Sequence, residues 1–393
     1  MRVAVIGGGV AGLSAAHALL AGGAEPVVFE ASSRAGGQVG TFSERGWLTE
    51  DGPHFVSRPV DSLPGLPGEV VEPQLPATRW VHLGGRVFKA PSLGLLARAG
   101  VLRALLEPLV AKPLVEDMPL RRFLVERLGS RAGSLAAAVL AAGVYAGDPD
   151  RLSARDAFPS LAARRSLFAR RPRSRLWNLR RGLGSLPIAA AEKLRVRLRA
   201  PVERLEPGWN VEGEKFDAVV LAIPASRAAS LTRGFAPPLA HALSSFESQP
   251  VTVVHLGFPH QQTPRGFGMI DADGTLHAVG TLFPSSMLPG RAPAGKSLVT
   301  AICRGEGDAG RVLADLRATF GVTGDPEYVR IVRHPEGIPQ YTVVHRDRVQ
   351  AARALLPPGL ELAGASYDGV AVPDAARSGA AAADRLLRAR SSS

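Results

Sequence analysis

RVAVIGGGVAGLSAAHALLAGGAEPVVFE, residues 2–30, is the most informative segment of this chain for its fold. It starts as a short apolar strand, passes through the motif Gly7-x-Gly9-x-x-Gly12, continues as an apolar helix and ends in a second strand at Glu30. In this pattern the first glycine permits a tight strand-to-helix turn and the second lets the backbone approach a pyrophosphate. The third lets the helix pack closely on the strand.

The same stretch carries two polar features that suit a dinucleotide. Unpaired N–H groups and the positive end of the helix dipole meet the phosphates at the helix N-terminus. Glu30 lies eighteen residues past Gly12, where a carboxylate bonds the ribose hydroxyls. The sequence therefore predicts a site for a flavin or nicotinamide dinucleotide, rather than a glycine-rich turn without a ligand.

Composition limits the class of protein. The 393 residues are enough for two or three domains, and a hydrophobic content of 46% excludes global disorder. The net charge of +12 favours anionic partners, but nucleic acid is not expected because no binding motif or interleaved aromatic residues accompany the charge. The single cysteine, Cys303, cannot form an internal disulfide and indicates a reducing cytoplasm. The apolar run at residues 135–147 is shorter than the roughly 18 residues that span a bilayer, so a membrane role would be peripheral.

The dinucleotide domain is predicted to combine three separated segments, 1–75, 193–235 and 355–393. Strand-like stretches recur at 193–206, 216–223 and 360–363, and the last of them precedes a terminal helix from about Pro373 to Arg388. Because other chain lies between these segments, other domains must be inserted.

Two inserts are predicted. Residues 95–192 carry apolar residues at helical spacing, whereas residues 76–94 and 236–354 are predicted to form a strand-rich substrate domain with an antiparallel sheet. The predicted fold class combines α/β and α+β parts: a Rossmann-like domain of discontinuous segments, an inserted strand-rich domain and an inserted helical domain. The expected strands of the substrate domain are Val251–Phe258, Gly266–Ile270, Thr275–Leu282 and Leu298–Arg304.

Two further glycine motifs follow the second strand. In residues 34–37, RAGG, paired glycines let the backbone pass close to a flat cofactor and Arg34 can reach a phosphate. Glycine and proline in residues 51–54, DGPH, would make a tight turn near a flavin ring; the alternative is two ordinary turns. The cofactor residues predicted from these motifs are Arg34, Gly36, Gly37, Gly52 and Pro53.

With these motifs the first segment resembles the flavin-containing amine oxidase superfamily, whose members use FAD. Later motifs are similar to those of oxygen-dependent protoporphyrinogen oxidases, and they occur in order along nearly the whole chain. They are Gly143-Val-Tyr-Ala-Gly-Asp148 with Leu152-Ser153 and Ala157-Phe-Pro159, residues 280–293, Gly337-Ile-Pro-Gln-Tyr341 with His345, and Gly369-Val-Ala-Val-Pro-Asp374 with Arg377-Ser-Gly379. Three positions depart from the usual family pattern: His54, where relatives often carry Asn or Arg, and Ala365 and Ala371, where Asn and Gly are usual.

The resemblance implies FAD as the cofactor, held without a covalent bond, and a porphyrinogen as the substrate. Arg79 matches an arginine that pairs with a propionate, a contact in which a guanidinium donates two parallel hydrogen bonds. Apart from the family, Arg79 would be interpreted as a surface residue and the apolar positions as core packing. The cofactor residues that the resemblance adds are Val202, Gly364, Val370 and Val372. The substrate residues are Arg79, His54, Phe267, Ile270, Leu282 and Ile302.

The resemblance also concerns partners. Leu95–Leu128 matches a membrane-binding helical region, which predicts peripheral attachment to the inner face of the cell membrane; a helical core that packs only on protein is the alternative. No acid occurs between Asp156 and Glu192, and the arginines there would contact anionic lipid, attract a polycarboxylate or form a solvated loop. A homodimer is the remaining partner prediction.

The function predicted in this way is the six-electron oxidation of protoporphyrinogen IX to protoporphyrin IX with O2 as acceptor, giving H2O2. No catalytic residue and no metal ligand are predicted, because the cofactor accepts hydride and the pyrrole N–H groups lose protons by tautomerisation. The sequence leaves open coproporphyrinogen III as the substrate, a flavin oxidase acting on amines or polyene lipids, and a flavoprotein without enzymatic activity in the haem pathway.

Overall fold

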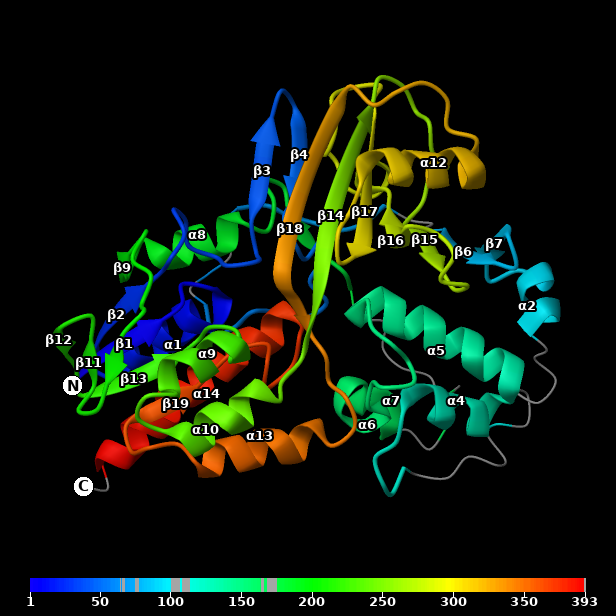
Figure 1. Cartoon of the computed structure of the whole chain (residues 1–393). Coiled ribbons are helices and arrows are strands. Elements are labelled where there is room, and N and C mark those ends of the chain that lie inside the picture. The colour runs from blue at the N-terminus through cyan, green and yellow to red at the C-terminus, as the bar shows by residue number, and fades with distance from the viewer. Residues whose placement is uncertain are drawn as a thin grey trace.

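The computed structural model describes residues 1–63, 65, 68–74, 78–99, 107, 114–163, 166–167 and 175–391. Two sheets dominate it. A parallel sheet with helices on both faces occupies one side of the molecule, a long-stranded sheet rises beside it, and a group of helices lies below the second sheet (Figure 1).

The parallel sheet unites distant parts of the chain. Its strand order is β19-β13-β1-β2-β9, and every neighbouring pair is parallel. The strands are β1 (Arg2–Ile6), β2 (Glu25–Phe29), β9 (Arg195–Arg197), β13 (Ala218–Leu221) and β19 (Leu360–Leu362). The central strands are apolar and buried because helices cover both faces, as is usual for a parallel sheet.

Helices α1 (Val10–Ala21) and α14 (Val372–Ser391) pack together on one face of this sheet. Gly379 makes their close approach possible, since a Cβ there would lie 1.9 Å from the carbonyl oxygen of Ala11. The α8 helix (Ser185–Ala191) also packs on α1, although the helical insert predicted at 95–192 includes it.

The opposite face is covered by α9 (Ala225–Thr232), α10 (Pro237–Ser244) and α13 (His345–Ala354). Leu239 of α10 and Val349 of α13 belong to the same buried cluster as Val219 of β13. The predicted boundaries at 236 and 354 therefore cut through the dinucleotide domain, because the helices beyond them complete its core.

The second sheet has seven strands in the order β18-β14-β17-β16-β15-β6-β7. It is not wholly antiparallel as predicted, since β15 and β6 run parallel where the hairpin from residues 79–90 joins the sheet. Helix α12 (Ala309–Phe320) covers one face. The strands are β6 (Arg79–Leu83), β7 (Arg86–Ala90), β14 (Ser248–Phe258), β15 (Gly268–Asp271), β16 (Ala278–Leu282), β17 (Ser297–Arg304) and β18 (Tyr328–Pro339).

The helical region places α5 (Ser130–Tyr145) against the second sheet and α4 (Leu120–Leu128) against α5. Its remaining helices are α2 (Leu93–Ala99), α6 (Ala154–Ala157) and α7 (Pro159–Ala162). None of the helices in the described part of the chain is long and apolar enough to cross a membrane. Several residues of the predicted apolar face and of the arginine-rich stretch lie outside the described residues: Leu102, Arg103, Leu106, Leu109, Arg164, Arg165, Arg170, Arg171 and Arg173.

Small elements complete the fold. The β3–β4 hairpin stands beside the second sheet in Figure 1. These elements are β3 (Thr41–Glu44), β4 (Trp47–Glu50), β5 (Val70–Val71), β8 (Asn178–Leu179), β10 (Leu205–Glu206), β11 (Asn210–Val211), β12 (Glu214–Lys215) and α11 (Pro284–Met287).

Candidate functional site

A cavity of about 860 Å³ opens at the carboxyl ends of the parallel strands, where α/β sheets usually bind ligands. The ends of β1, β2, β13 and β19 all contribute to its wall. The predicted cofactor residues that line it are Gly7, Gly9, Glu30, Gly36, Gly37, Pro53, Val202, Gly364, Val370 and Val372. Gly12, Arg34 and Gly52 do not line it.

The glycine loop has the backbone geometry that a close ligand requires. Gly7 has a φ of +106°, and a Cβ there would meet the carbonyl oxygen of Ala222 at 2.4 Å. A Cβ on Gly12 would meet the carbonyl oxygen of Gly7 at 1.9 Å, so Gly12 acts through helix packing. Gly9 caps α1 in an extended conformation without a side-chain acceptor for the first N–H groups. Those donors are thus left for an anion at the helix N-terminus.

Glu30 is fixed at the end of β2. Its Oε2 accepts a hydrogen bond from the Gly8 N–H at 2.7 Å, and its Oε1 accepts one from the Ser32 N–H at 2.8 Å. The residue is buried and lines the cavity. A carboxylate oxygen can accept more than one bond, so Glu30 can still accept from a ligand hydroxyl.

Arg34 forms an ion pair with Asp51 and does not line the cavity. Its Nη2 donates to Asp51 Oδ2 at 2.6 Å, while Arg330 of β18 donates to the other Asp51 oxygen at 2.6 Å. Through Asp51, Arg34 therefore links the loop of residues 34–37 to β18 of the second sheet, instead of lining the phosphate region as predicted.

The cation that does line the cavity, Arg227, was not predicted from the sequence. Arg227, in the first turn of α9, is the only lysine or arginine among the lining residues that the structure describes. A signal was available, because Arg227 lies in the first turn of the helix that follows the predicted strand at 216–223. A cation in that position adjoins the carboxyl ends of the sheet.

His54 lies between the cavity wall and the second sheet. Its Nδ1 donates to the Gly52 carbonyl oxygen at 2.9 Å, and its buried Nε2 has no hydrogen-bond partner among the described residues. Burial first, and then the nearby Arg291 charge, lower the pKa of His54 to about 4. The ring centroid of His255 lies 6.2 Å away, and burial also lowers the pKa of that imidazole. Both rings are neutral at physiological pH.

The predicted substrate residues of the second sheet share one face. Cross-strand partners point to the same face, and the register aligns Arg79, Gly268, Leu282 and Thr300 in one row. The adjacent row aligns Val81, Ile270, Gly280 and Ile302. Helix α5 lies over this face, since a Cβ on Gly143 would be 3.6 Å from Ile270 Cδ1.

Phe267 and Arg79 meet at the edge of this face. The Arg79 guanidinium lies over the Phe267 ring at 4.8 Å, and Phe267 stacks on Phe55 at 5.2 Å. Arg79 is exposed, and none of the sheet residues predicted to bind substrate lines the 860 Å³ cavity. The structure thus gathers the predicted substrate residues on a surface separate from the cofactor cavity, with His54 between the two.

Tyr341 was not predicted as a site residue, yet it holds the cavity wall formed by residues 364–370. Its hydroxyl donates to the Ala365 carbonyl oxygen at 2.8 Å and accepts from the Gly369 N–H at 2.5 Å. The ring stacks on His345 with centroids 3.7 Å apart. Burial raises the pKa of the Tyr341 hydroxyl, which keeps this donor protonated.

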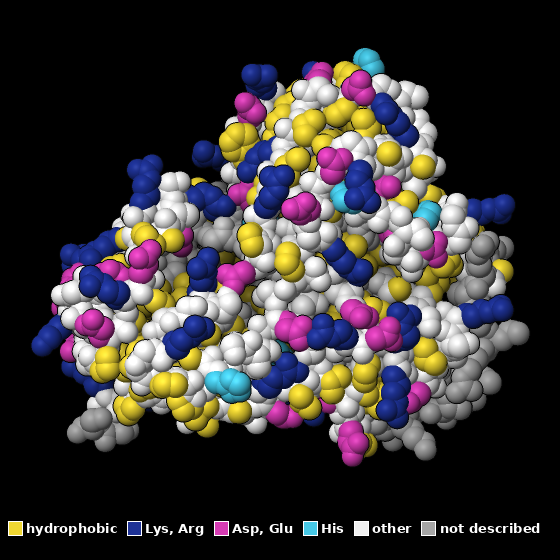
Figure 2. Space-filling model, in the orientation of Figure 1, with side chains coloured by type: hydrophobic (Ala, Val, Ile, Leu, Met, Phe, Trp, Pro, Cys, Tyr) yellow, Lys and Arg dark blue, Asp and Glu magenta, His cyan; other side chains and the backbone are white. Residues whose placement is uncertain are grey.

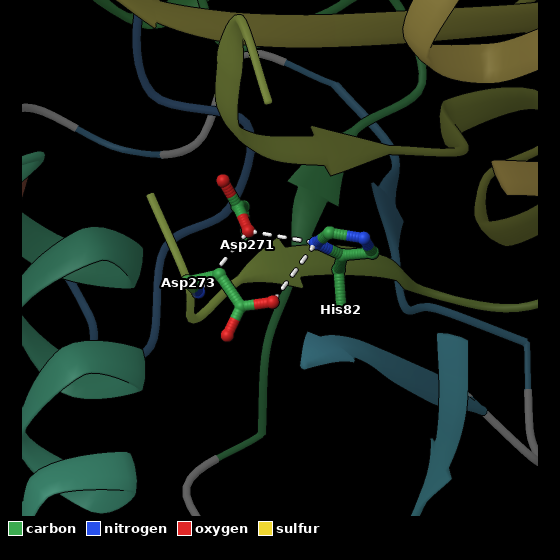
Figure 3. A group of neighbouring side chains, drawn as sticks. All are labelled: His82, Asp271 and Asp273. Atoms are coloured by element: carbon green, nitrogen blue, oxygen red, sulfur yellow. Dashed lines mark hydrogen bonds and ion pairs between the residues drawn. The ribbon is translucent and has the colours of Figure 1, made fainter. Parts of the chain in front are cut away.

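His82, Asp271 and Asp273 form a compact polar cluster (Figure 3). Asp271 Oδ1 accepts from His82 Nδ1 at 2.9 Å and from the Asp273 N–H at 3.2 Å, and Oδ2 accepts from the Leu276 N–H at 2.8 Å. These bonds join β6 to the turn that follows β15. We assign the cluster this structural role, because both oxygens of its buried carboxylate accept hydrogen bonds from protein donors.

Comparison with known proteins gives consistent matches. The family model described as flavin containing amine oxidoreductase matches residues 10–77 and 120–387. A protoporphyrinogen oxidase from Bos taurus is 30% identical, with 98% of each chain covered. A coproporphyrinogen III oxidase from Bacillus subtilis is 26% identical, also with 98% of each covered.

Solved structures agree on the fold. The crystal structure of a putative protoporphyrinogen oxidase from an Exiguobacterium species superposes with a TM-score of 0.85 at 26% identity, covering 98% of each chain. Cyclohexylamine oxidase from Brevibacterium oxydans has a TM-score of 0.72 at 16% identity, covering 99% of each chain, and shares the fold.

Proposed function

The chain belongs to the flavin-containing amine oxidoreductase family, and from this premise we propose that it is an FAD-dependent, oxygen-dependent porphyrinogen oxidase. The proposed reaction oxidises protoporphyrinogen IX to protoporphyrin IX with O2 as acceptor and H2O2 as product. The proposal rests on a cavity large enough for a dinucleotide and, on the other side of His54, a sheet face with apolar side chains and an arginine at its edge. Relatives named for both protoporphyrinogen and coproporphyrinogen oxidation support it.

The described residues of the cavity fit FAD. Gly9 and Gly37 present backbone without side chains beside the N-terminus of α1, which suits a pyrophosphate. Glu30 offers a fixed carboxylate for ribose hydroxyls, and Pro53 adjoins the side of the cavity that faces His54. When bound, the flavin supplies a hydride acceptor and passes the electrons to O2.

The protein's own part in the reaction is to hold a hydrophobic tetrapyrrole beside that acceptor. Ile270 and Ile302 are half-buried beside helix α5, and the ring would pack against the part of these side chains that α5 leaves exposed, which removes ring carbons from water. A carboxylate at the ring edge would replace the Phe267 contact of Arg79 by a charge-assisted hydrogen bond. No side-chain base is assigned, since the pyrrole nitrogens can release protons by tautomerisation.

Arg79 can be tested separately from the overall activity. We expect Arg79→Ala to raise KM about ten- to a hundredfold, the range for a lost hydrogen bond to a charged group, while the flavin spectrum stays unchanged. Arg79→Lys should recover only part of the loss, because an ammonium cannot form the bidentate contact. Arg86→Ala, on the neighbouring strand β7, is the matched control. Unchanged kinetics in both Arg79 variants would remove this residue from the substrate site.

The proposed activity is tested by adding protoporphyrinogen IX to the purified, FAD-loaded protein in air. Porphyrin fluorescence should rise, with O2 consumed and H2O2 released in step. Under argon, the substrate should bleach the yellow protein without turnover. Failure to bleach would contradict an enzymatic role and leave the chain as a flavoprotein without this activity.

Coproporphyrinogen III is the second candidate substrate, and the 26% identical relative from Bacillus subtilis favours it. The two substrates differ in propionate and vinyl groups at the ring edge, so kcat/KM measured on both identifies the preferred one. Amine substrates provide a further comparison, because amine oxidases share the fold. H2O2 release from amines but not from either porphyrinogen would overturn the proposal.

A further inference from the structure

We propose that Arg227 is the side-chain cation that binds the pyrophosphate of the cofactor, an inference that rests on the proposed use of FAD. Within the described lining of the cavity it is the only arginine or lysine, whereas Glu30, Glu203 and Glu336 also line it. The pyrophosphate of FAD carries two negative charges. The helix N-terminus offsets only about half of one charge, so a cation in the cavity wall would stabilise the remaining charge of the ligand.

Arg227 has the position that this role requires. β13 runs beside β1 with Leu221 paired to Ile6, and α9 starts directly after β13 while the glycine loop starts directly after β1. The first turns of α9 and α1 therefore adjoin the same edge of the sheet. Figure 1 shows α9 next to the lower ends of β14 and β18.

The surroundings of Arg227 also separate it from an ordinary surface arginine. Gln38 follows the paired glycines and donates from Nε2 to the carbonyl oxygens of Glu336 at 3.1 Å and Gly337 at 2.7 Å. Gln38, Arg227, Ser230 and Glu336 line both the cofactor cavity and an adjoining polar hollow of about 480 Å³. Arg227 thus lies where the cavity meets this hollow, near the backbone that follows Gly37.

Arg227 is also free to turn toward a ligand. Its ion pair with Glu336 has an Nε–Oε2 distance of 3.7 Å, and its side chain is 76% exposed. An exposed pair of this kind contributes little to stability, so little is lost when the guanidinium moves to a phosphate. Arg34, the cation predicted for this role, is held by Asp51. The alternative is that Arg227 only pairs with Glu336 and does not contact the cofactor.

Equilibrium titration of the apoprotein with FAD, followed by quenching of flavin fluorescence, separates the two interpretations. Arg227→Met should raise the Kd for FAD about ten- to a hundredfold. The Kd of Arg227→Lys should lie between the values for wild type and Arg227→Met. Riboflavin, which has no phosphate, should bind wild type and Arg227→Met equally. Added salt should weaken FAD binding more in wild type than in the variant, because the contact is electrostatic.

Arg233→Met is the matched control, since Arg233 is exposed at the end of α9 and does not line the cavity. Glu336→Gln should tighten FAD binding, because it removes the acid that competes for Arg227. Binding of FAD by Arg227→Met within twofold of wild type, or an equal loss in Arg233→Met, would overturn the inference. Wild-type protein that fails to bind FAD would instead refute the proposed function, and the role of Arg227 with it.

Discussion

The stability of this protein should fall as the pH drops from 6.5 toward 4, and His345 allows the effect to be measured at one residue. The His345 ring is 3% exposed, stacks on Tyr341 and has no partner for Nε2 among the described residues. Burial lowers the pKa of His345 to about 4 against the opposing charge of Asp156, while Arg348 adds to the lowering.

The direction and size of the pH effect follow from the number of protons that the folded and unfolded states bind. Between pH 6.5 and 4 the unfolded chain carries a proton on His345 that the folded protein excludes. Low pH therefore favours the unfolded state. Each pH unit in this window costs about 1.4 kcal/mol, so a fall from pH 6.5 to 5 removes about 2 kcal/mol of folding free energy. Above pH 6.5 both states are neutral at this residue and the contribution is complete.

His345→Phe tests this reasoning, because a phenyl ring can keep the stacking on Tyr341 and the edge contact with Phe246. Urea unfolding at pH values from 7.5 to 4.5 should show a slope of stability against pH that is shallower by about one proton in the variant. His54 and His255 steepen the slope in the same direction, so the comparison uses the difference between proteins. His241→Phe, at an exposed position on α10, is the control. Parallel curves for wild type and His345→Phe would refute the reasoning.

Three further predictions concern single residues. Val344→Gly should stabilise the protein by about 1 kcal/mol, because Val344 is held at φ +63°, where a β-branched residue is strained. Val144→Gly, in the last turn of α5, relieves no such strain and should not stabilise the protein, and thermal unfolding of both variants checks the difference. Glu50→Gln should cost about 1–3 kcal/mol in urea unfolding, because the amide would leave the charge of buried Arg291, 3.8 Å from Glu50 Oε1, without its carboxylate partner. Glu50→Gln as stable as wild type would contradict this. Cys303 should react with a thiol reagent only after unfolding, because burial raises its pKa to about 12; modification of the native protein would disprove it.

The dinucleotide loop was predictable from the sequence because its constraints are local. Gly7 takes a positive φ, and a Cβ on Gly12 would meet the backbone of the same loop, so local backbone geometry favours glycine at both positions. Glu30 follows from the same pattern, since the end of β2 is a fixed distance from the first turn of α1. Such signals can be recognised in the sequence without any knowledge of the rest of the fold.

The charges of the site were less predictable, because a side chain's partner can lie far away in the sequence. Arg34 follows the motif that should bring it to a phosphate, yet Asp51 holds it and Arg330, almost 300 residues away, holds Asp51. The helices α10 and α13 illustrate the same limit for domains. Their apolar faces predict burial but do not say which of two cores will bury them.

The strand β18 explains how the two halves of the site can be held in one geometry. Its central residues belong to the second sheet, with Val332 paired to Val253, while its final residues Glu336, Gly337 and Pro339 line the cofactor cavity. Figure 1 shows β18 and β14 running from the top of the second sheet into the dinucleotide domain. A rigid strand has few soft degrees of freedom once its ladder is formed, so the sheet face and the cavity cannot shift independently.

Hydrogen bonds at the lower end of β18 reinforce this coupling on both sides of the cavity. Gln38, which follows the paired glycines Gly36 and Gly37, donates to the Gly337 carbonyl oxygen. Tyr341, two residues beyond the strand, donates to the carbonyl oxygen of Ala365. Hydride transfer needs the donor carbon and the acceptor within a narrow range of positions, and a substrate held by one sheet can meet a cofactor held by another only if the sheets are fixed together. The polar residues around β18 are therefore as much a part of the proposed site as the residues that line it.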